Sequence, residues 1–226
     1  MSVTLEQAVE AHVVPRADGT EQAVQGEPLL TVEEFLALCE RPEYQDQQLE
    51  LDEGRLIVMP PAGVRHGGGC WLIAAVLADY VRGVGRGMAV TNDAGLMLAV
   101  TPSTIRAPDI AFYRDKRRLE ELSEGVASEL PQLVVEVLSP SDRPNDVARK
   151  VQQYLRAGIE MVWVVEPQDR TVAVYRRGRE PQVLGENETL SGEDVLPGFS
   201  VPVADLFRLP GTQPLAKPAE PSQGQS

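Results

Sequence analysis

Hydrophobic and polar positions alternate along the middle of the chain and predict a succession of helices and strands. Thr31 and Glu34 have the spacing of a capping box, which opens a helix through Phe35 and Leu38. In QLELDEGRLIVM (48–59), two short apolar runs flank a Glu-Gly pair and predict a β-hairpin. The pattern then predicts a helix over 66–82 and strands near 88–91, 94–100 and 109–113.

The second half of the chain alternates in the same manner. The apolar run LVVEVLS (133–139) predicts a buried strand. Ser141 or Asp142 could cap the following helix, with Pro144 in its first turn and Gly158 as its stop. Two more strands are expected at 161–166 and 171–175. Together these elements predict a mixed sheet flanked by helices, which is an α/β or α+β fold.

The two ends of the chain differ from this pattern. Residues 1–28 have weak periodicity, so we expect a flexible arm there. Residues 208–226 are rich in Pro, Gly, Ser and Gln, which predicts a disordered tail. A single domain is therefore expected over residues 29–207.

Composition narrows the class of protein. Among the 226 residues, 42% are hydrophobic, which suffices for a sizeable core. No apolar run is long enough for a membrane span, and no secretory signal is visible, so a cytoplasmic location is expected. Cys39 and Cys70 are the two cysteines, and buried free thiols are favoured over a disulfide.

The charge balance argues against one class of function. The formal net charge is −13, whereas proteins that bind nucleic acid regardless of sequence neutralise phosphates with Lys and Arg. A nucleic-acid site in this chain would therefore need a local basic patch or a bound metal ion.

Glu136 is the charged residue least expected from its surroundings. It lies in the middle of the apolar run LVVEVL, where an unpaired carboxylate would cost several kcal/mol unless it is paired or bound to metal. The alternatives are a strand-end Glu that is open to solvent and a Glu paired with an arginine. Asp109, which follows Pro108 at the start of a strand, could share a divalent cation with Glu136.

Lys150 is the third candidate. It lies on the helix after the Glu136 strand, beside the row of apolar residues that packs on the sheet, so it could reach over the sheet edge. An alternative is a surface pair with Asp146, four residues earlier. The His66–Cys70 spacing alone is weak evidence for zinc, because no second pair of ligands accompanies it.

At this point the chain resembles the restriction-endonuclease-like Uma-two family of the PD-(D/E)XK nuclease superfamily. The order and spacing of several segments agree over roughly residues 30–207. These segments are LELDEGRLIVMPP (49–61) with His66 after it, APDIAF (107–112), LVVEVLSPS (133–141), Asp146 with Lys150 and Tyr154, AGIEMVWVVEP (157–167) and TVAVY (171–175).

The resemblance implies a restriction-endonuclease-like mixed sheet and assigns roles to residues. It implies that Asp109 and Glu136 bind metal and that Glu50 lies near the metal. In the simplest superfamily pattern a lysine follows two residues after the Glu, where this chain has Leu138. The lysine of families like this one is expected on the next helix, which fits Lys150. The resemblance also matches His66 to a recurrent histidine.

These observations favour a Mg²⁺- or Mn²⁺-dependent endonuclease that hydrolyses phosphodiester bonds, with DNA as its expected partner. Asp109, Glu136 and the carbonyl of Val137 would hold the metal, with Glu50 acting through water, and Lys150 would orient the attacking water. Three further residues are expected on the substrate side, namely Arg106, His66 and Tyr154, although a structural ion pair is an equal alternative for Arg106. The rival is a non-catalytic nuclease-fold module for binding or assembly. A homodimer is left open in both cases.

Overall fold

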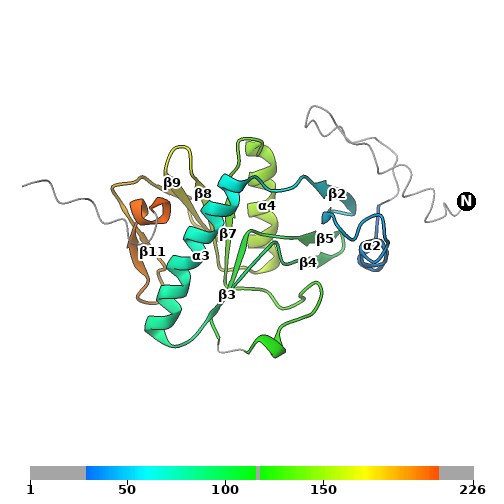
Figure 1. Cartoon of the computed structure of the whole chain (residues 1–226), viewed down its shortest axis with the longest axis horizontal. Helices are drawn as coiled ribbons and strands as arrows, with labels where there is room; N and C mark the ends of the chain where they lie inside the picture. The colour runs from blue at the N-terminus through cyan, green and yellow to red at the C-terminus, as the bar shows by residue number, and fades with distance from the viewer. Residues whose placement is uncertain (1–28, 116–117, 209–226) are drawn as a thin grey trace, which may run out of the picture.

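The computed structural model describes residues 29–115 and 118–208, in which helices and strands pack as layers (Figure 1). The expected arm over 1–28 lies outside the described residues, as does the tail beyond residue 208. Within the described ranges, no helix is both long and apolar enough to cross a membrane.

A six-stranded sheet forms the centre of the molecule, in the order β10-β9-β8-β7-β6-β3. β7 and β8 run parallel and are joined by α4, whereas the other neighbouring strands run antiparallel. The elements are β3 (Met88–Thr91), β6 (Ile110–Tyr113), β7 (Leu133–Val137), α4 (Pro144–Ala157), β8 (Met161–Glu166), β9 (Thr171–Arg176) and β10 (Gln182–Leu184).

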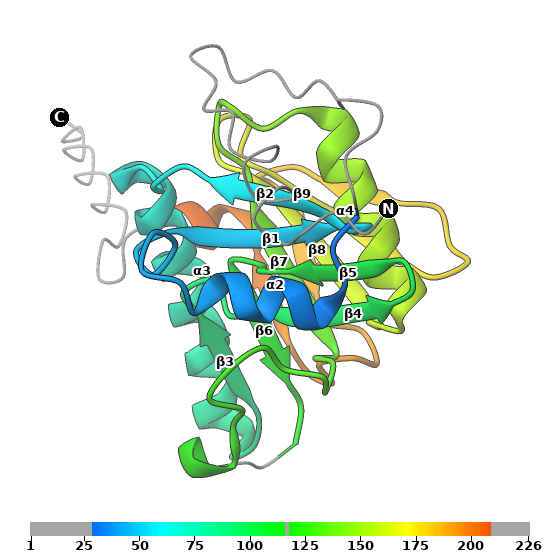
Figure 2. The ribbon, with the colours of Figure 1, turned by 90° about the vertical axis from the view of Figure 1, so that its right-hand side faces the viewer.

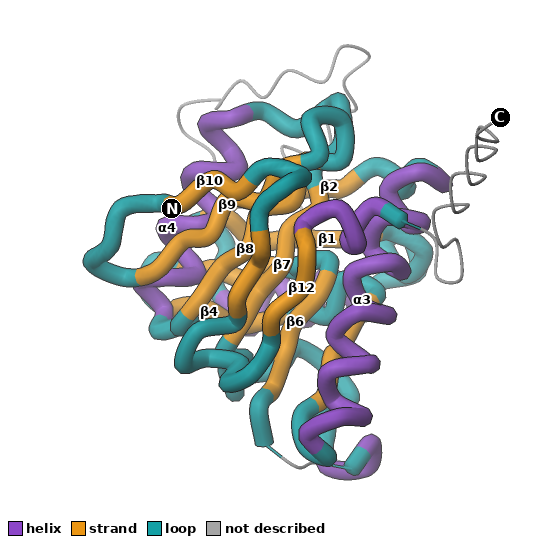
Figure 3. Tube along the Cα trace, turned by 90° about the vertical axis from the view of Figure 1, so that its left-hand side faces the viewer, coloured by secondary structure: helices purple, strands orange, loops and turns teal. Residues whose placement is uncertain are grey.

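Helices cover both faces of this sheet. α3 (Val64–Val84) packs Ile73 and Leu77 against Phe112, Val135 and other side chains of one face. α4 packs Val151 and Tyr154 against the opposite face. The C-terminal elements β11 (Thr189–Ser191), β12 (Ser200–Pro202) and η2 (Val203–Phe207) add to the α3 side (Figure 3). A sheet buried on both faces explains why β7 and β8 are apolar throughout, apart from their carboxylates.

A four-stranded antiparallel sheet, in the order β2-β1-β5-β4, lies beside the central sheet (Figure 2). Its elements are β1 (Gln48–Asp52), β2 (Arg55–Met59), β4 (Leu96–Val100) and β5 (Ser103–Arg106). α2 (Val32–Cys39) packs on it through a cluster that includes Phe35, Leu38 and Ile105. A short 3-10 turn, η1 (Leu119–Glu121), completes the described elements.

Most of the expected elements are confirmed. Thr31 and Glu34 form the capping box of α2, Glu53 and Gly54 form the hairpin turn with positive φ angles, and Gly158 ends α4. One expectation is wrong: α4 is capped by Arg143, and Asp142 instead accepts a hydrogen bond from the amide of Ser139. β5 and β10 to β12 were not expected from the sequence pattern, and β10 to β12 are only three residues long.

Candidate active site

The candidate site lies at one end of β6 and β7. Ile110 pairs with Val135 in the antiparallel register, so Asp109 and Glu136, the next residues along, come opposite each other. The amide of Val137 donates a 2.6 Å hydrogen bond to Oδ2 of Asp109, which fixes this carboxylate against the neighbouring strand. The two acidic residues are therefore held together by the pairing of the strands that carry them.

Glu136 is buried and receives contacts from α4. The hydroxyl of Tyr154 donates a 2.5 Å hydrogen bond to Oε1, and Nζ of Lys150 lies 3.5 Å from Oε2. Burial raises the pKa of Glu136 to about 7, and the nearby Asp109 and Glu50 add to this, although Lys150 and Tyr154 act in the opposite direction. The protein therefore holds this carboxylate in a state that favours a proton or a metal ion.

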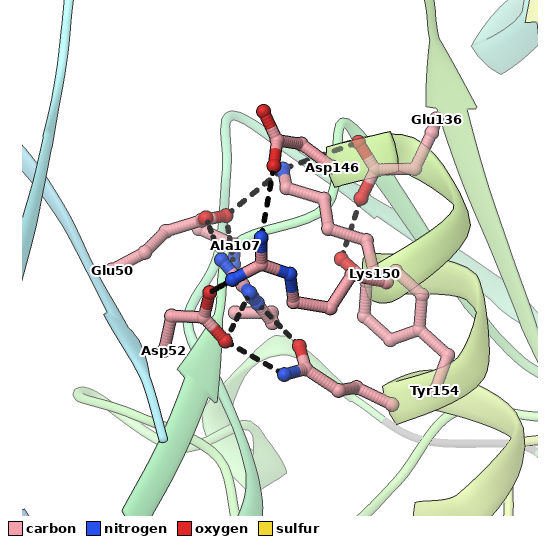
Figure 4. Close-up of polar contacts among 10 residues, drawn as sticks. Glu50, Asp52, Ala107, Glu136, Asp146, Lys150 and Tyr154 are labelled. Carbon is pink, nitrogen blue, oxygen red and sulfur yellow. Dashed lines mark hydrogen bonds and ion pairs between the residues drawn. The ribbon is translucent and has the colours of Figure 1, made fainter. Parts of the chain in front are cut away.

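Lys150 bridges two carboxylates from different sheets. Its Nζ lies 3.1 Å from Glu50 on β1 as well as 3.5 Å from Glu136 on β7 (Figure 4). Burial alone would lower the pKa of Lys150, but Glu136 and Glu50 raise it overall, so the side chain is an ammonium. Asp146, the alternative partner, pairs with Arg149 instead. The lysine thus faces the carboxylates.

Arg106 belongs to a buried ion-pair network behind the site. Its guanidinium lies 2.8 Å from Glu50 and 2.7 Å from Asp52, and its Nε donates to Gln153 over 2.8 Å. The Arg106 side chain is 3% exposed. We therefore revise its expected contact with substrate phosphate in favour of the structural ion pair.

Tyr154 requires a similar revision. Its side chain is fully buried and its hydroxyl points at Glu136 (Figure 4), so Tyr154 has no exposed surface with which to contact a substrate. Glu50 is also fully buried, and it accepts a hydrogen bond from the amide of Ala107 in addition to its two cations. Both residues position the groups that surround the site.

His66 lies on α3 and contacts Asp109 from the face of the central sheet opposite α4. Its Nε2 lies 2.9 Å from Oδ1 of Asp109 and 3.5 Å from Sγ of Cys70, one helical turn later on α3. The bond to Asp109, followed by the contact with Cys70, raises the pKa of His66 to about 11. Its Nδ1 is buried and has no hydrogen-bond partner within the described ranges.

Asp93 is a site residue that the sequence pattern did not reveal. It lies between β3 and β4, where Asn92 and Asp93 both have positive φ angles. Burial raises its pKa, and the nearby Asp109 raises it further, whereas His66 and Lys150 lower it. The Asn-Asp pair predicts a turn but carries no sign of chemistry, because Asn and Asp are the residues that turns favour in any case.

The arrangement combines several acidic side chains with one lysine, which shares Glu50 with Arg106. Glu50, Asp93, Asp109 and Glu136 interact electrostatically with Lys150 or with one another. Carboxylates that repel each other in a buried setting are a fitting donor set for a hard divalent cation, which takes oxygen ligands. The residues present can therefore hold such an ion.

Comparisons with known proteins identify the family and the fold. A family model described as "Putative restriction endonuclease" matches residues 32–204. A solved structure, described as a putative nuclease belonging to DUF820 from Anabaena variabilis, is similar with a TM-score of 0.65 and 22% identity. The match covers 79% of this chain and 97% of that one. No curated protein sequence matches. The fold is thus the restriction-endonuclease-like mixed α+β fold, and the chain belongs to the Uma2 family of restriction-endonuclease-like proteins.

Proposed function

We propose that the protein is a metal-dependent endonuclease that hydrolyses phosphodiester bonds in DNA. The observation that carries this proposal is the convergence of Asp109, Glu136 and Lys150 at one end of β6 and β7, supported by membership of the family. The acidic pair can hold a divalent cation that activates water for phosphodiester hydrolysis, and the adjacent ammonium can stabilise the charge that develops on the phosphoryl group.

Mg²⁺ or Mn²⁺ would be held by Asp109, Glu136 and the carbonyl of Val137. When bound, the ion would polarise the phosphoryl group and lower the pKa of an attacking water. Val137 fits this role because its amide already contacts Asp109, so its backbone lies next to the carboxylate. Glu136 fits because burial disfavours its ionised form in the absence of a counter-charge.

Besides the metal ion, Lys150 supplies a positive charge at the site. Its side chain is 18% exposed and its ammonium lies between Glu136 and Glu50, so the ammonium can meet a substrate oxygen or orient a water without leaving its partners. Glu50 holds this ammonium, and Arg106 holds Glu50 from behind. Tyr154 fixes the orientation of Glu136 in the same manner. The residues behind the site therefore keep the reacting groups in place.

The net charge of −13 sets a condition on the substrate. A strongly acidic protein makes few phosphate contacts and binds nucleic acid weakly at physiological salt. We therefore expect cleavage to be seen first at low ionic strength. The same charge supports the rival function, a non-catalytic binding module, and the experiment below separates the two.

The test is cleavage of supercoiled plasmid and of RNA at low salt, with Mg²⁺, Mn²⁺ or EDTA. Wild type should cut DNA only with metal, whereas Asp109→Asn should lose activity by about 100-fold or more while staying folded. Asp79→Asn is the matched control, because Asp79 is an exposed aspartate on α3 that pairs with Arg82. If metal stabilises wild type against heat but no substrate is cleaved, the non-catalytic binding module replaces the endonuclease as the proposed function.

A further inference from the structure

Donor atoms of three kinds meet near the N-terminal end of α3. His66 and Cys70 are four residues apart on this helix, so both side chains lie on one side of it, and Asp109 reaches the same place from the start of β6. The three donor atoms, a ring nitrogen, a thiol sulfur and a carboxylate oxygen, all lie within 4.8 Å of one another.

The contacts converge on one nitrogen. Nε2 of His66 lies 2.9 Å from Asp109 and 3.5 Å from Cys70, although it can carry at most one proton. If Nε2 is protonated it donates to the carboxylate, and if it is not it accepts from the thiol. A single proton therefore cannot serve both neighbours well, whereas a cation between the three atoms would contact all of them.

Two of the three donor spacings are close to those of a tetrahedral metal site, and the third, between Asp109 and Cys70, is within 4.8 Å. Typical zinc bond lengths at a tetrahedral angle place N and O about 3.4 Å apart and N and S about 3.6 Å apart. The observed distances are 2.9 Å and 3.5 Å, so the nitrogen and oxygen would separate by a few tenths of an ångström. Oδ2 of Asp109 would keep its bond to the Val137 amide, because the site uses Oδ1.

We propose that His66, Cys70 and Asp109 form a binding site for a thiol-preferring divalent ion of the Zn²⁺ type, distinct from the Mg²⁺ site but sharing Asp109 with it. Mg²⁺ takes oxygen ligands and has little affinity for a thiolate, whereas Zn²⁺ binds nitrogen, sulfur and oxygen together. The sequence offered only the His66–Cys70 pair, and the structure adds the third ligand.

Sharing a carboxylate has a consequence that rests on the proposed function. If Asp109 also holds Mg²⁺, then Zn²⁺ at the mixed site withdraws that ligand and inhibits cleavage. Binding displaces the Nε2 proton of His66 as well as the thiol proton of Cys70, so the affinity for Zn²⁺ rises with pH. The site would therefore act as an inhibitory zinc site beside the nuclease centre.

The experiment uses Co²⁺ as the probe, because a Co²⁺–thiolate bond gives a charge-transfer band in the near ultraviolet. The metal-free full-length protein should develop this band at one equivalent, and Zn²⁺ should remove it whereas excess Mg²⁺ should not. Cys70→Ser should abolish the band. Cys39→Ser is the matched control and should keep it, because Cys39 lies on α2 in a different hydrophobic cluster. His66→Gln should weaken binding by at least about 10-fold to 100-fold.

The outcomes separate the two proposals. A missing band, or a band of equal strength in Cys70→Ser, overturns the mixed site, provided that thermal melts show both variants folded. Co²⁺ binding without nuclease activity keeps the mixed site and overturns the proposed function. Where cleavage is present, Cys70→Ser should need about 10-fold more Zn²⁺ for half-inhibition than Cys39→Ser. Equal Zn²⁺ sensitivity of the two variants would show that Asp109 is not shared.

Discussion

Tyr154 donates its hydroxyl hydrogen to Glu136 across 2.5 Å, and both groups are buried in the contact between α4 and β7. This bond opposes the rise that burial gives to the pKa of Glu136. Tyr154 thereby favours the ionised form of Glu136 near neutral pH. Tyr154 itself is not among the residues proposed to contact substrate or metal.

Replacing Tyr154 with Phe should move the pH profile of cleavage. Without the donor, the pKa of Glu136 rises further, so the pH of half-maximal activity shifts upwards. The free energy of unfolding should fall by about 1 to 3 kcal/mol, because a buried acceptor loses its partner. Tyr113→Phe is the control, since it removes a hydroxyl that donates to the carbonyl of Glu129. Equal pH profiles for both variants would show that Tyr154 is only a packing residue.

Glu136→Gln should raise the stability of the metal-free protein. The folded protein holds the proton of Glu136 with a pKa of about 7, above its ordinary value of 4.5. Stability from this group is therefore complete below about pH 4.5 and is lost as pH rises to about 7, by up to roughly 3 kcal/mol. Urea unfolding in EDTA should show this slope in wild type and in the surface control Glu43→Gln. If Glu136→Gln keeps the same dependence of stability on pH, that dependence belongs to another group.

Lys150→Met should separate metal binding from catalysis. Its ammonium shares Glu136 with the proposed metal, so removing it should increase the thermal stabilisation that Mg²⁺ provides. Cleavage should nevertheless fall by about 100-fold or more, because the stabilising charge is lost. Thermal melts with and without Mg²⁺, together with cleavage rates, measure both effects. A parallel loss of Mg²⁺ binding would make Lys150 a structural residue.

Replacing Arg106 should lower the stability of the fold. Arg106→Leu leaves Glu50 and Asp52 with fewer cations in a buried setting, so the free energy of unfolding should fall by about 3 to 5 kcal/mol. Arg149→Leu is the control, because Arg149 contacts the same Asp52 from an exposed position and should cost about 1 kcal/mol or less. If Arg106→Leu unfolds like wild type but binds DNA less tightly, Arg106 contacts the phosphate after all.

The sequence predicted the elements that have strong local signals. The capping box at Thr31, the Glu53-Gly54 hairpin and the stop at Gly158 are set by residues near one another in the chain, and the structure confirms them. The acidic residue inside the apolar strand β7 pointed to the site for the same reason, because a buried carboxylate is costly wherever the rest of the chain lies.

Other features depend on tertiary contacts that no local pattern encodes. Cys70 and Asp93 join the site because α3 and the β3–β4 turn meet the end of β6. In the sequence, the His66–Cys70 spacing is only a weak signal for Cys70, and Asp93 carries no chemical signal. The sequence placed Arg106 and Tyr154 near the carboxylates but could not show that both side chains are buried, nor that Arg106 forms the ion pair weighed as an alternative to substrate contact. The short strands β10 to β12 were missed because three residues give too little periodicity.

The site is assembled across a joint between two sheets. Glu50 and Arg106 lie on the four-stranded sheet, whereas Glu136 lies on the six-stranded one, and Ala107 and Pro108 link β5 to β6 at this joint. Each sheet has a hydrophobic cluster of its own, and a third cluster joins Leu96 of β4 to Val134 and Tyr154 beside the six-stranded sheet. A slight separation of the sheets on heating would therefore disperse the charged groups and loosen this third cluster while leaving the other two packed. The protein should lose activity at a temperature below that at which its secondary structure melts. The upper temperature limit of its activity would then be set by the joint between the two sheets and not by the hydrophobic cluster of either sheet.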